Sequence, residues 1–159
     1  MENKKRILFL CTGNSARSQM AEALMNRLGG DEFVAFSAGS NPQAAVHPLA
    51  IKTMHDMGID ISQNSTKSMD KFLHEPWDVI ITVCDNAREA CPIFPGQVAG
   101  AHWGFDDPAA FEGDDDEKEE MFVNTAVGLE QRIRLFLALP HGELAHHEYV
   151  QALQEIGKS

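Results

Sequence analysis

Short apolar runs and longer segments with helical periodicity alternate along this chain. Four apolar runs bounded by polar or turn-forming residues predict β-strands, and they cover residues 6–10, 33–37, 77–83 and 98–103. Between and after them, apolar residues recur every three to four positions, which predicts helices. These helices cover residues 16–28, 48–57, 66–73 (the weakest pattern) and 117–139, while residues 143–156 could form a further helix or a tail.

The order of these elements predicts the fold class. Strands that alternate with helices form βαβ units, in which the strands run parallel and the helices cover the sheet. The first strand is a continuous apolar run, typical of a parallel strand buried on both faces. We therefore predict an α/β domain with a four-stranded parallel sheet flanked by helices on both faces. Pro140 and Gly142 interrupt the pattern, so we place this domain at 1–139 and a C-terminal extension of unknown role at 140–159.

Charge and composition limit the classes of partner. The chain has 24 acidic and 13 basic residues, a formal net charge of -11, and this balance disfavours binding to nucleic acid or to an anionic membrane surface. No apolar stretch is long enough to span a bilayer, and the run that follows the basic N-terminus is too short for a signal peptide. We therefore expect a cytoplasmic protein. Its three cysteines are expected to be reactive or buried thiols rather than a structural disulfide framework.

The most specific chemical motif directly follows the first strand. A turn between the end of a buried parallel strand and the start of a helix is where open α/β sheets bind ligands, and the free amides of the helix favour an anion there. Arg17 offers a planar fork for two oxygens of phosphate or arsenate, and together with the amides it favours the thiolate form of Cys11. Ser18 can donate a hydrogen bond to that thiolate, and Asn14 can brace the loop. We predict a nucleophilic Cys11 at the base of an oxyanion site formed by Thr12, Gly13, Asn14, Ser15, Ala16, Arg17 and Ser18. The alternative is a buried cysteine beside a surface arginine.

Two further cysteines, Cys84 and Cys91, follow the third predicted strand. Because parallel strands end at the same edge of a sheet, Cys84 is expected to lie at the edge where Cys11 lies. The spacing by itself fits two core cysteines. It fits a metal site less well, since it is not the short spacing of zinc ligands and His102 is the only imidazole nearby in sequence. A redox-active pair is the third possibility.

The run from Cys11 to Ser18, with the four residues after it, resembles the phosphate loop of the low-molecular-weight protein tyrosine phosphatases. It resembles still more closely the thioredoxin-coupled arsenate reductases that share that fold, and the resemblance extends from Arg6 to about Phe136. This resemblance implies a four-stranded parallel sheet and the reduction of arsenate to arsenite. We expect no cofactor and no metal site in this chain. It also implies thioredoxin, or a glutaredoxin-type thiol donor, as the partner that resets the enzyme.

The resemblance also assigns roles outside the loop. In these reductases, cysteines at the positions of Cys84 and Cys91 form a thiol–disulfide relay with the loop cysteine. Asp107, which precedes Pro108, matches the general acid of an Asp-Pro loop, although such a residue could also simply form a turn. Phosphatases of this fold usually carry tyrosines just after that pair, where they wall an aryl ring. Here Ala109 and Ala110 occupy those places, which favours the reductase.

Lys67 departs from the pattern of some relatives, which hold a potassium ion between a carboxylate near this position and groups matching Asn14, Glu22 and Ser37. The ammonium of Lys67 could replace that ion, in which case the protein is active without potassium. Alternatively, Lys67 is a solvated surface lysine. The acidic run 114–117 is expected to be a solvated segment that favours the start of the next helix, with a cation site as its alternative.

Two other functions compete with arsenate reduction. A phosphatase acting on phosphotyrosine or small phosphomonoesters would use Cys11, Arg17 and Asp107 in the same way, with water cleaving the phosphocysteine. A non-enzymatic binder or sensor of arsenite or another soft metal would use the thiols without turnover.

Overall fold

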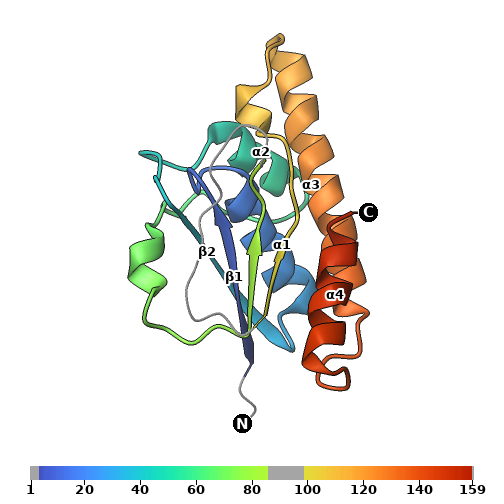
Figure 1. The fold of residues 1–159 in the computed structure, drawn as a ribbon. Helices are drawn as coiled ribbons and strands as arrows, with labels where there is room; N and C mark the ends of the chain where they lie inside the picture. The colour runs from blue at the N-terminus through green and yellow to red at the C-terminus, as the bar shows by residue number, and fades with distance from the viewer. Residues whose placement is uncertain (1–3, 86–98, 159) are drawn as a thin grey trace.

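Four parallel strands form the centre of the molecule in the order β2-β1-β3-β4 (Figure 1). The computed structural model describes residues 4–85 and 99–158 of the chain. The strands are β1 (Lys5–Cys11), β2 (Phe33–Gly39), β3 (Val79–Thr82) and β4 (Ala99–His102). The predicted four-stranded parallel sheet is therefore confirmed.

Strand β1 lies at the centre because its sequence suits burial on both faces. Its last five residues are all buried, and it pairs with β2 on one side and β3 on the other. In this register Cys11 lies opposite Gly39, and Leu10 lies opposite Thr82. The carboxyl ends of three strands thus meet beside Cys11.

The two faces of the sheet are covered differently. The larger apolar core packs the helices α1 (Arg17–Gly29), α2 (Pro48–Asp56), α3 (Asp115–Leu137) and α4 (His146–Ile156) together with the sheet. On the other face, among the described residues, a smaller cluster joins Leu8, Leu10 and Ile80 to Phe72 and Trp77, next to the 3-10 turn η1 (Met69–Phe72). A second 3-10 turn, η2 (Pro108–Ala110), precedes α3.

The predicted helix at 66–73 is wrong in length, since only η1 is helical there. The residues before it run along the end of β2: Gly39 N donates to Lys67 O at 2.9 Å, and Ser68 forms a parallel bridge with Gly39. This extended pairing prevents helical geometry until Ser68, whose hydroxyl accepts from Asp70 N at 3.2 Å. The tertiary contact with β2 therefore overrides the local helical pattern.

The acidic run 114–117 starts α3, as the sequence suggests. Asp114 is the N-cap, and it forms a capping box with Glu117: Glu117 N donates to Asp114 Oδ1 at 2.8 Å, and Asp114 N donates to Glu117 Oε1 at 3.1 Å. The other two acids lie in the first turn, where the helix dipole favours negative charge. Because these acids belong to the helix, α3 begins two residues earlier than predicted.

The C-terminal segment forms a helix rather than a tail. Helix α4 packs against β4 and α3 at the edge of the sheet (Figure 1). The indole of the buried Trp103, which directly follows β4, donates to Leu153 O at 3.0 Å, and the Leu153 side chain is fully buried. No helix within 4–85 or 99–158 is long and apolar enough to cross a membrane.

Because α4 belongs to the core, we predict that Leu153→Ala lowers the free energy of unfolding by roughly 2–4 kcal/mol through lost burial and the cavity left behind. Gln154→Ala, at the exposed neighbouring position, is the matched control and is expected to change it by less than about 0.5 kcal/mol. Denaturant unfolding of both variants measures the difference. Equal small effects would mean that α4 is not packed as described.

Candidate active site

Cys11 is the last residue of β1, and its sulfur lies at the base of the loop that follows. The Cys11 side chain is buried and its thiol is free. Asn14 N donates to Cys11 Sγ at 3.2 Å, and Ser18 Oγ lies 2.8 Å from the same sulfur. Asn14 has a φ of 50°, a left-handed conformation that turns its backbone amide back toward the sulfur. The loop thus surrounds the sulfur with hydrogen-bond donors.

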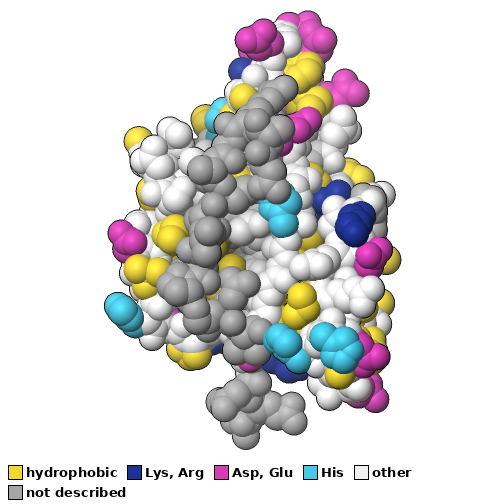
Figure 2. All heavy atoms as spheres, viewed as in Figure 1, with side chains coloured by type: hydrophobic (Ala, Val, Ile, Leu, Met, Phe, Trp, Pro, Cys, Tyr) yellow, Lys and Arg dark blue, Asp and Glu magenta, His cyan; other side chains and the backbone are white. Residues whose placement is uncertain are grey.

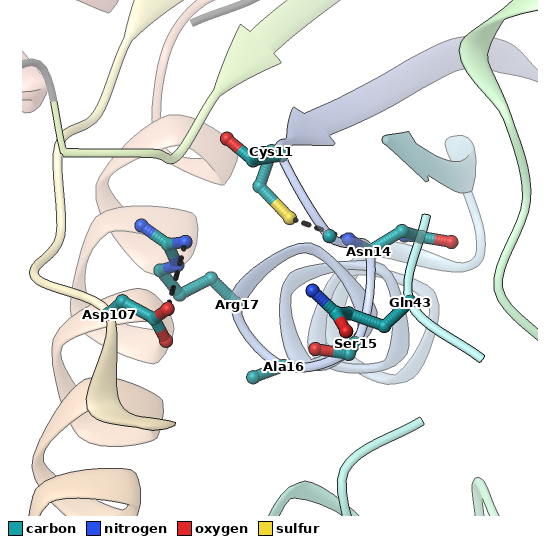
Figure 3. A pocket seen from close by; sticks show the side chains of 9 residues that line it. Cys11, Asn14, Ser15, Ala16, Arg17, Gln43 and Asp107 are labelled. Carbon is teal, nitrogen blue, oxygen red and sulfur yellow. Dashed lines mark hydrogen bonds and ion pairs between the residues drawn. The ribbon is translucent and has the colours of Figure 1, made fainter. Parts of the chain in front are cut away.

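The start of α1 borders the same cavity and has no side-chain cap. Its N-cap residue is Ala16, which has no side chain that could cap the helix, so the first amides are not satisfied by a side chain. A helix N-terminus with free amides is a natural anion site. These residues line a small polar cavity of about 90 Å³, bounded by Cys11, Thr12, Gly13, Asn14, Ser15, Ala16, Arg17, Gln43 and Asp107 (Figure 3).

Arg17 and Asp107 lie on one side of this cavity. Arg17 is nearly fully buried, its Nη1 donates to Phe105 O at 3.1 Å, and its Nη2 lies 3.8 Å from Asp107 Oδ2 (Figure 3). The other carboxylate oxygen of Asp107 accepts from Ala109 N at 3.0 Å, so Asp107 also caps the turn η2. A guanidinium and a carboxylate therefore meet at the rim of the cavity. The guanidinium can bind two oxygens of an oxyanion, and the carboxylate can protonate an oxygen that leaves.

A network of hydrogen bonds behind the loop holds Asn14. Its Nδ2 donates to Ser18 Oγ at 2.8 Å, and its Oδ1 accepts from Gln19 Nε2 at 3.1 Å and from Lys67 N at 2.9 Å. The Asn14 side-chain amide thus holds both Ser18, whose hydroxyl contacts the Cys11 sulfur, and the backbone of Asn14, which donates to that sulfur. The predicted bracing role of Asn14 matches these contacts.

Lys67 lies in this network rather than in solvent. Its Nζ is 3.9 Å from Glu22 Oε1 and donates to Ser65 O at 3.0 Å, and Ser37 Oγ donates to Glu22 Oε1 at 2.7 Å. Burial raises the pKa of Glu22, opposed by the Ser37 hydrogen bond and the charge of Lys67. Burial lowers the pKa of Lys67, opposed by the charge of Glu22. The two groups therefore form a mostly buried ion pair directly behind the loop.

Cys84 lies two residues beyond the end of β3, the strand next to β1. Val83 N donates to Leu10 O at 2.9 Å, so the pairing of β3 with β1 continues up to the two cysteines. Cys84 is fully buried and disulfide-bonded, whereas Cys11 is a free thiol. The predicted placement of Cys84 at the sheet edge of Cys11 is thus confirmed, while Cys91 lies outside the described residues.

The sequence analysis missed two residues next to the loop, of which Gln43 lines the cavity. Gln43 lies over Gly13, where a Cβ would be 2.9 Å from Gln43 Cγ, and Gly39 approaches the loop so closely that a Cβ there would be 2.5 Å from Thr12 O. Gln43 is held by its backbone, since its N donates to Gly13 O at 2.9 Å and its O accepts from Thr66 Oγ1 at 2.6 Å. The only signal was their position, Gly39 as the last residue of β2 and Gln43 four residues later, at the end of a strand that neighbours β1.

Metal ligands do not gather at this site. In the described part of the chain, no group of three or more His, Cys, Asp or Glu side chains is arranged to hold a metal ion. The donors around the cavity are amides, a hydroxyl and a guanidinium, which suit an anion.

Comparison with known proteins places this geometry in a family. The family model described as low molecular weight phosphotyrosine protein phosphatase matches residues 6–150, most of the chain. The chain belongs to this family. It is 44% identical over 134 residues to an arsenate reductase of Halalkalibacterium halodurans, with 84% of this chain and 96% of the relative covered.

Solved structures of this phosphatase family's fold agree with the sequence comparison. An arsenate reductase in a phosphate-binding state superposes with a TM-score of 0.68 at 30% identity, covering 84% of this chain and 97% of the other. A thioredoxin-dependent arsenate reductase from Corynebacterium glutamicum superposes with a TM-score of 0.55 at 28% identity, covering 84% of this chain and 64% of that one. The sequence-based resemblance to this family is therefore confirmed.

The position of Lys67 generates a prediction about potassium for this family member. Because its ammonium already supplies positive charge beside Glu22, affinity for inorganic phosphate is expected to agree within about twofold in potassium and sodium buffers of equal ionic strength. Lys67→Met removes the charge and is expected to weaken phosphate binding roughly three- to tenfold through a less rigid Asn14. Isothermal titration calorimetry measures both effects, with exposed Lys71→Met as the control. Marked tightening by potassium in the unaltered protein would contradict the assignment.

Proposed function

We propose that this protein is an arsenate reductase that uses Cys11, Cys84 and Cys91 in a thiol–disulfide relay. One observation carries the proposal. A free Cys11 at the base of an oxyanion cavity and a disulfide-bonded Cys84 lie at the same edge of the sheet. A hydrolytic phosphatase needs the first feature and has no use for the second. The names of the relatives at 44% and 30% identity support the same choice.

The first step is attack of the Cys11 sulfur on arsenic. Backbone amides of the loop and Arg17 bind the oxygens of arsenate. These hydrogen bonds become stronger as negative charge develops on the oxygens in the transition state. Asp107, at the rim beside Arg17, donates a proton to one arsenate oxygen, which leaves as water. The product is an arsenic(V) group bound to Cys11 Sγ.

The second step transfers electrons to arsenic. The Cys84 thiolate attacks Cys11 Sγ, the S–As bond breaks, and its electron pair stays on arsenic, which leaves as arsenite. A Cys11–Cys84 disulfide forms, so two thiols have lost two electrons and arsenic has gained them. The contact between Cys11 Sγ and Ser18 Oγ favours the departure of Cys11 as a thiolate in the next exchange.

The third step passes the disulfide on and resets the enzyme. Cys91 attacks Cys84 Sγ, which releases Cys11 and leaves a Cys84–Cys91 disulfide for an external dithiol to reduce. Thioredoxin is the reductant that the C. glutamicum relative's name supports, and a glutaredoxin-type donor is the alternative. Dependence on such a donor fits a cytoplasmic location, since the cytosol keeps thiols reduced.

In the proposal, residues 1–139 carry this activity, because every residue with a role in the mechanism lies in that range. The segment 140–159 serves as an extension that covers the edge strand β4 through α4.

Phosphatase activity is the second candidate, favoured by the family description and by a loop that binds phosphate and arsenate alike. Cys11, Arg17 and Asp107 would keep their roles, and water would cleave the phosphocysteine. Ala109 and Ala110 provide no aromatic wall for an aryl phosphate. We therefore assign this activity as a weak side reaction.

The assignment predicts how the relay cysteines separate the two activities. With thioredoxin, its reductase and NADPH, Cys84→Ser and Cys91→Ser are each expected to lower steady-state arsenate turnover by more than about a hundredfold, because the relay cannot complete a cycle. Hydrolysis of p-nitrophenyl phosphate by the same variants is expected to continue at the level of the unaltered protein.

Cys11→Ser is the matched control and is expected to abolish both activities. A phosphatase would be indifferent to Cys84→Ser and Cys91→Ser and would not oxidise NADPH with arsenate. A binder of arsenite would show no turnover in either assay.

A further inference from the structure

A histidine that the proposed mechanism does not use lies beside the relay. His102 is the last residue of β4, and it pairs in register with Thr82, two residues before Cys84. Its Nδ1 lies 2.7 Å from Thr82 Oγ1. Its Nε2 faces the turn at Gly104, where a Cβ would lie 2.9 Å from Nε2 and 3.4 Å from Cys84 O. The imidazole and the backbone of the relay cysteine thus meet at the same glycine.

The surroundings hold the backbone on either side of this ring in place. The backbone N of Trp103, the residue after His102, donates to Thr82 O at 2.7 Å. Gly157, at the end of α4, lies so close to the carbonyl of His102 that a Cβ would not fit there. From α3, Arg132 Nη1 donates to Gly104 O at 3.2 Å, and its guanidinium lies 4.3 Å from the centre of the Phe105 ring. Contacts from β3, α3 and α4 therefore fix the backbone from His102 to Gly104 at the end of β4.

Two charged groups face the ring. Burial and the charge of Arg132 lower the pKa of His102, whereas the charge of Asp85, the residue after Cys84, raises it. The net direction is downward, so the ring is neutral at pH 7 and has a lone pair with which to accept a proton. It is half-buried, so a proton that it has accepted can pass to solvent.

Cys84 needs such an acceptor. Its side chain is fully buried, and burial in apolar surroundings disfavours a thiolate. Only the thiolate attacks a sulfur. In the mechanism proposed above, no other group beside Cys84 takes its proton.

We propose that His102 accepts the proton of the Cys84 thiol as Cys84 attacks the Cys11–arsenic adduct, an inference that rests on the proposed arsenate reductase function. In the proposed step, the ring is the tautomer in which Nδ1–H donates to Thr82 Oγ1. The lone pair is then on Nε2, the nitrogen beside Gly104, where the backbone carbonyl of Cys84 also approaches. The Cys84 S–H bond breaks and its proton moves to Nε2, the sulfur forms the bond to Cys11 Sγ, and the electron pair of the S–As bond stays on arsenic. The imidazolium then releases the proton to solvent.

The test follows this one step in a Cys91→Ser background, where the Cys11–Cys84 disulfide accumulates. Reduced protein is mixed with arsenate between pH 6 and 9, quenched with acid, and the disulfide is quantified by mass spectrometry. His102→Gln is expected to slow disulfide formation roughly tenfold at pH 7, with the difference disappearing toward pH 9, where the thiol ionises without help. Thr82→Val is expected to act in the same direction, and Thr82→Ser, which keeps the hydroxyl, is expected to match the parent.

A rate for His102→Gln within twofold of the parent at pH 7 would overturn the proposal, and so would an equal slowing at every pH, which is the mark of a purely structural effect. Phosphate binding by calorimetry checks that the Cys11 loop of each variant is intact. Iodoacetamide alkylation of Cys84 in a Cys11→Ser, Cys91→Ser background needs no arsenate, and His102→Gln is expected to slow it at pH 7 by a similar factor. If the parent forms no disulfide with arsenate, the proposed function fails, whereas loss of the His102 effect on alkylation refutes only the role of His102.

Discussion

The hydrogen bonds to the Cys11 sulfur are the constraint on which the rest of the site depends. They require β1 to end at Cys11, the chain to turn through a left-handed Asn14, and α1 to begin within a few residues so that Ser18 returns to the sulfur. The same turn places the start of α1, which no side chain caps, at the cavity and brings Arg17 to its rim. A nucleophile and its oxyanion clamp are therefore consequences of one backbone path.

That path is held from behind by charge as well as by hydrogen bonds. Asn14 joins the loop to Lys67, and Lys67 pairs with Glu22, which Ser37 of β2 also contacts. Removing one member of a mostly buried pair leaves the other without compensation. The ion pair thus links β2, α1 and the segment before η1 at the place where the reactive sulfur needs rigidity. The carboxyl ends of β3 and β4 place Cys84 and His102 at the same edge of the sheet as Cys11.

Local signals were enough to predict β1, its loop and the position of Cys84. A continuous apolar run, a glycine-containing turn and an amphipathic helix lie next to one another in the sequence, so no long-range information was needed. The places of Gln43 and Lys67 depend on the path of the chain after β2 and on its pairing with Ser68, which no local pattern encodes. The same pairing shortened the helix expected at 66–73 to η1. His102 was considered only as a metal ligand, because its partners Thr82, Arg132 and Asp85 come from separate parts of the chain.

The most direct test of the account is whether arsenate itself oxidises the protein, and which sulfurs it joins. Reduced Cys91→Ser protein, incubated with one equivalent of arsenate and no other oxidant, should yield one arsenite and one disulfide that peptide mapping assigns to Cys11 and Cys84, while phosphate yields neither. A protein that stays fully reduced, or a disulfide that does not include Cys11, would contradict the account.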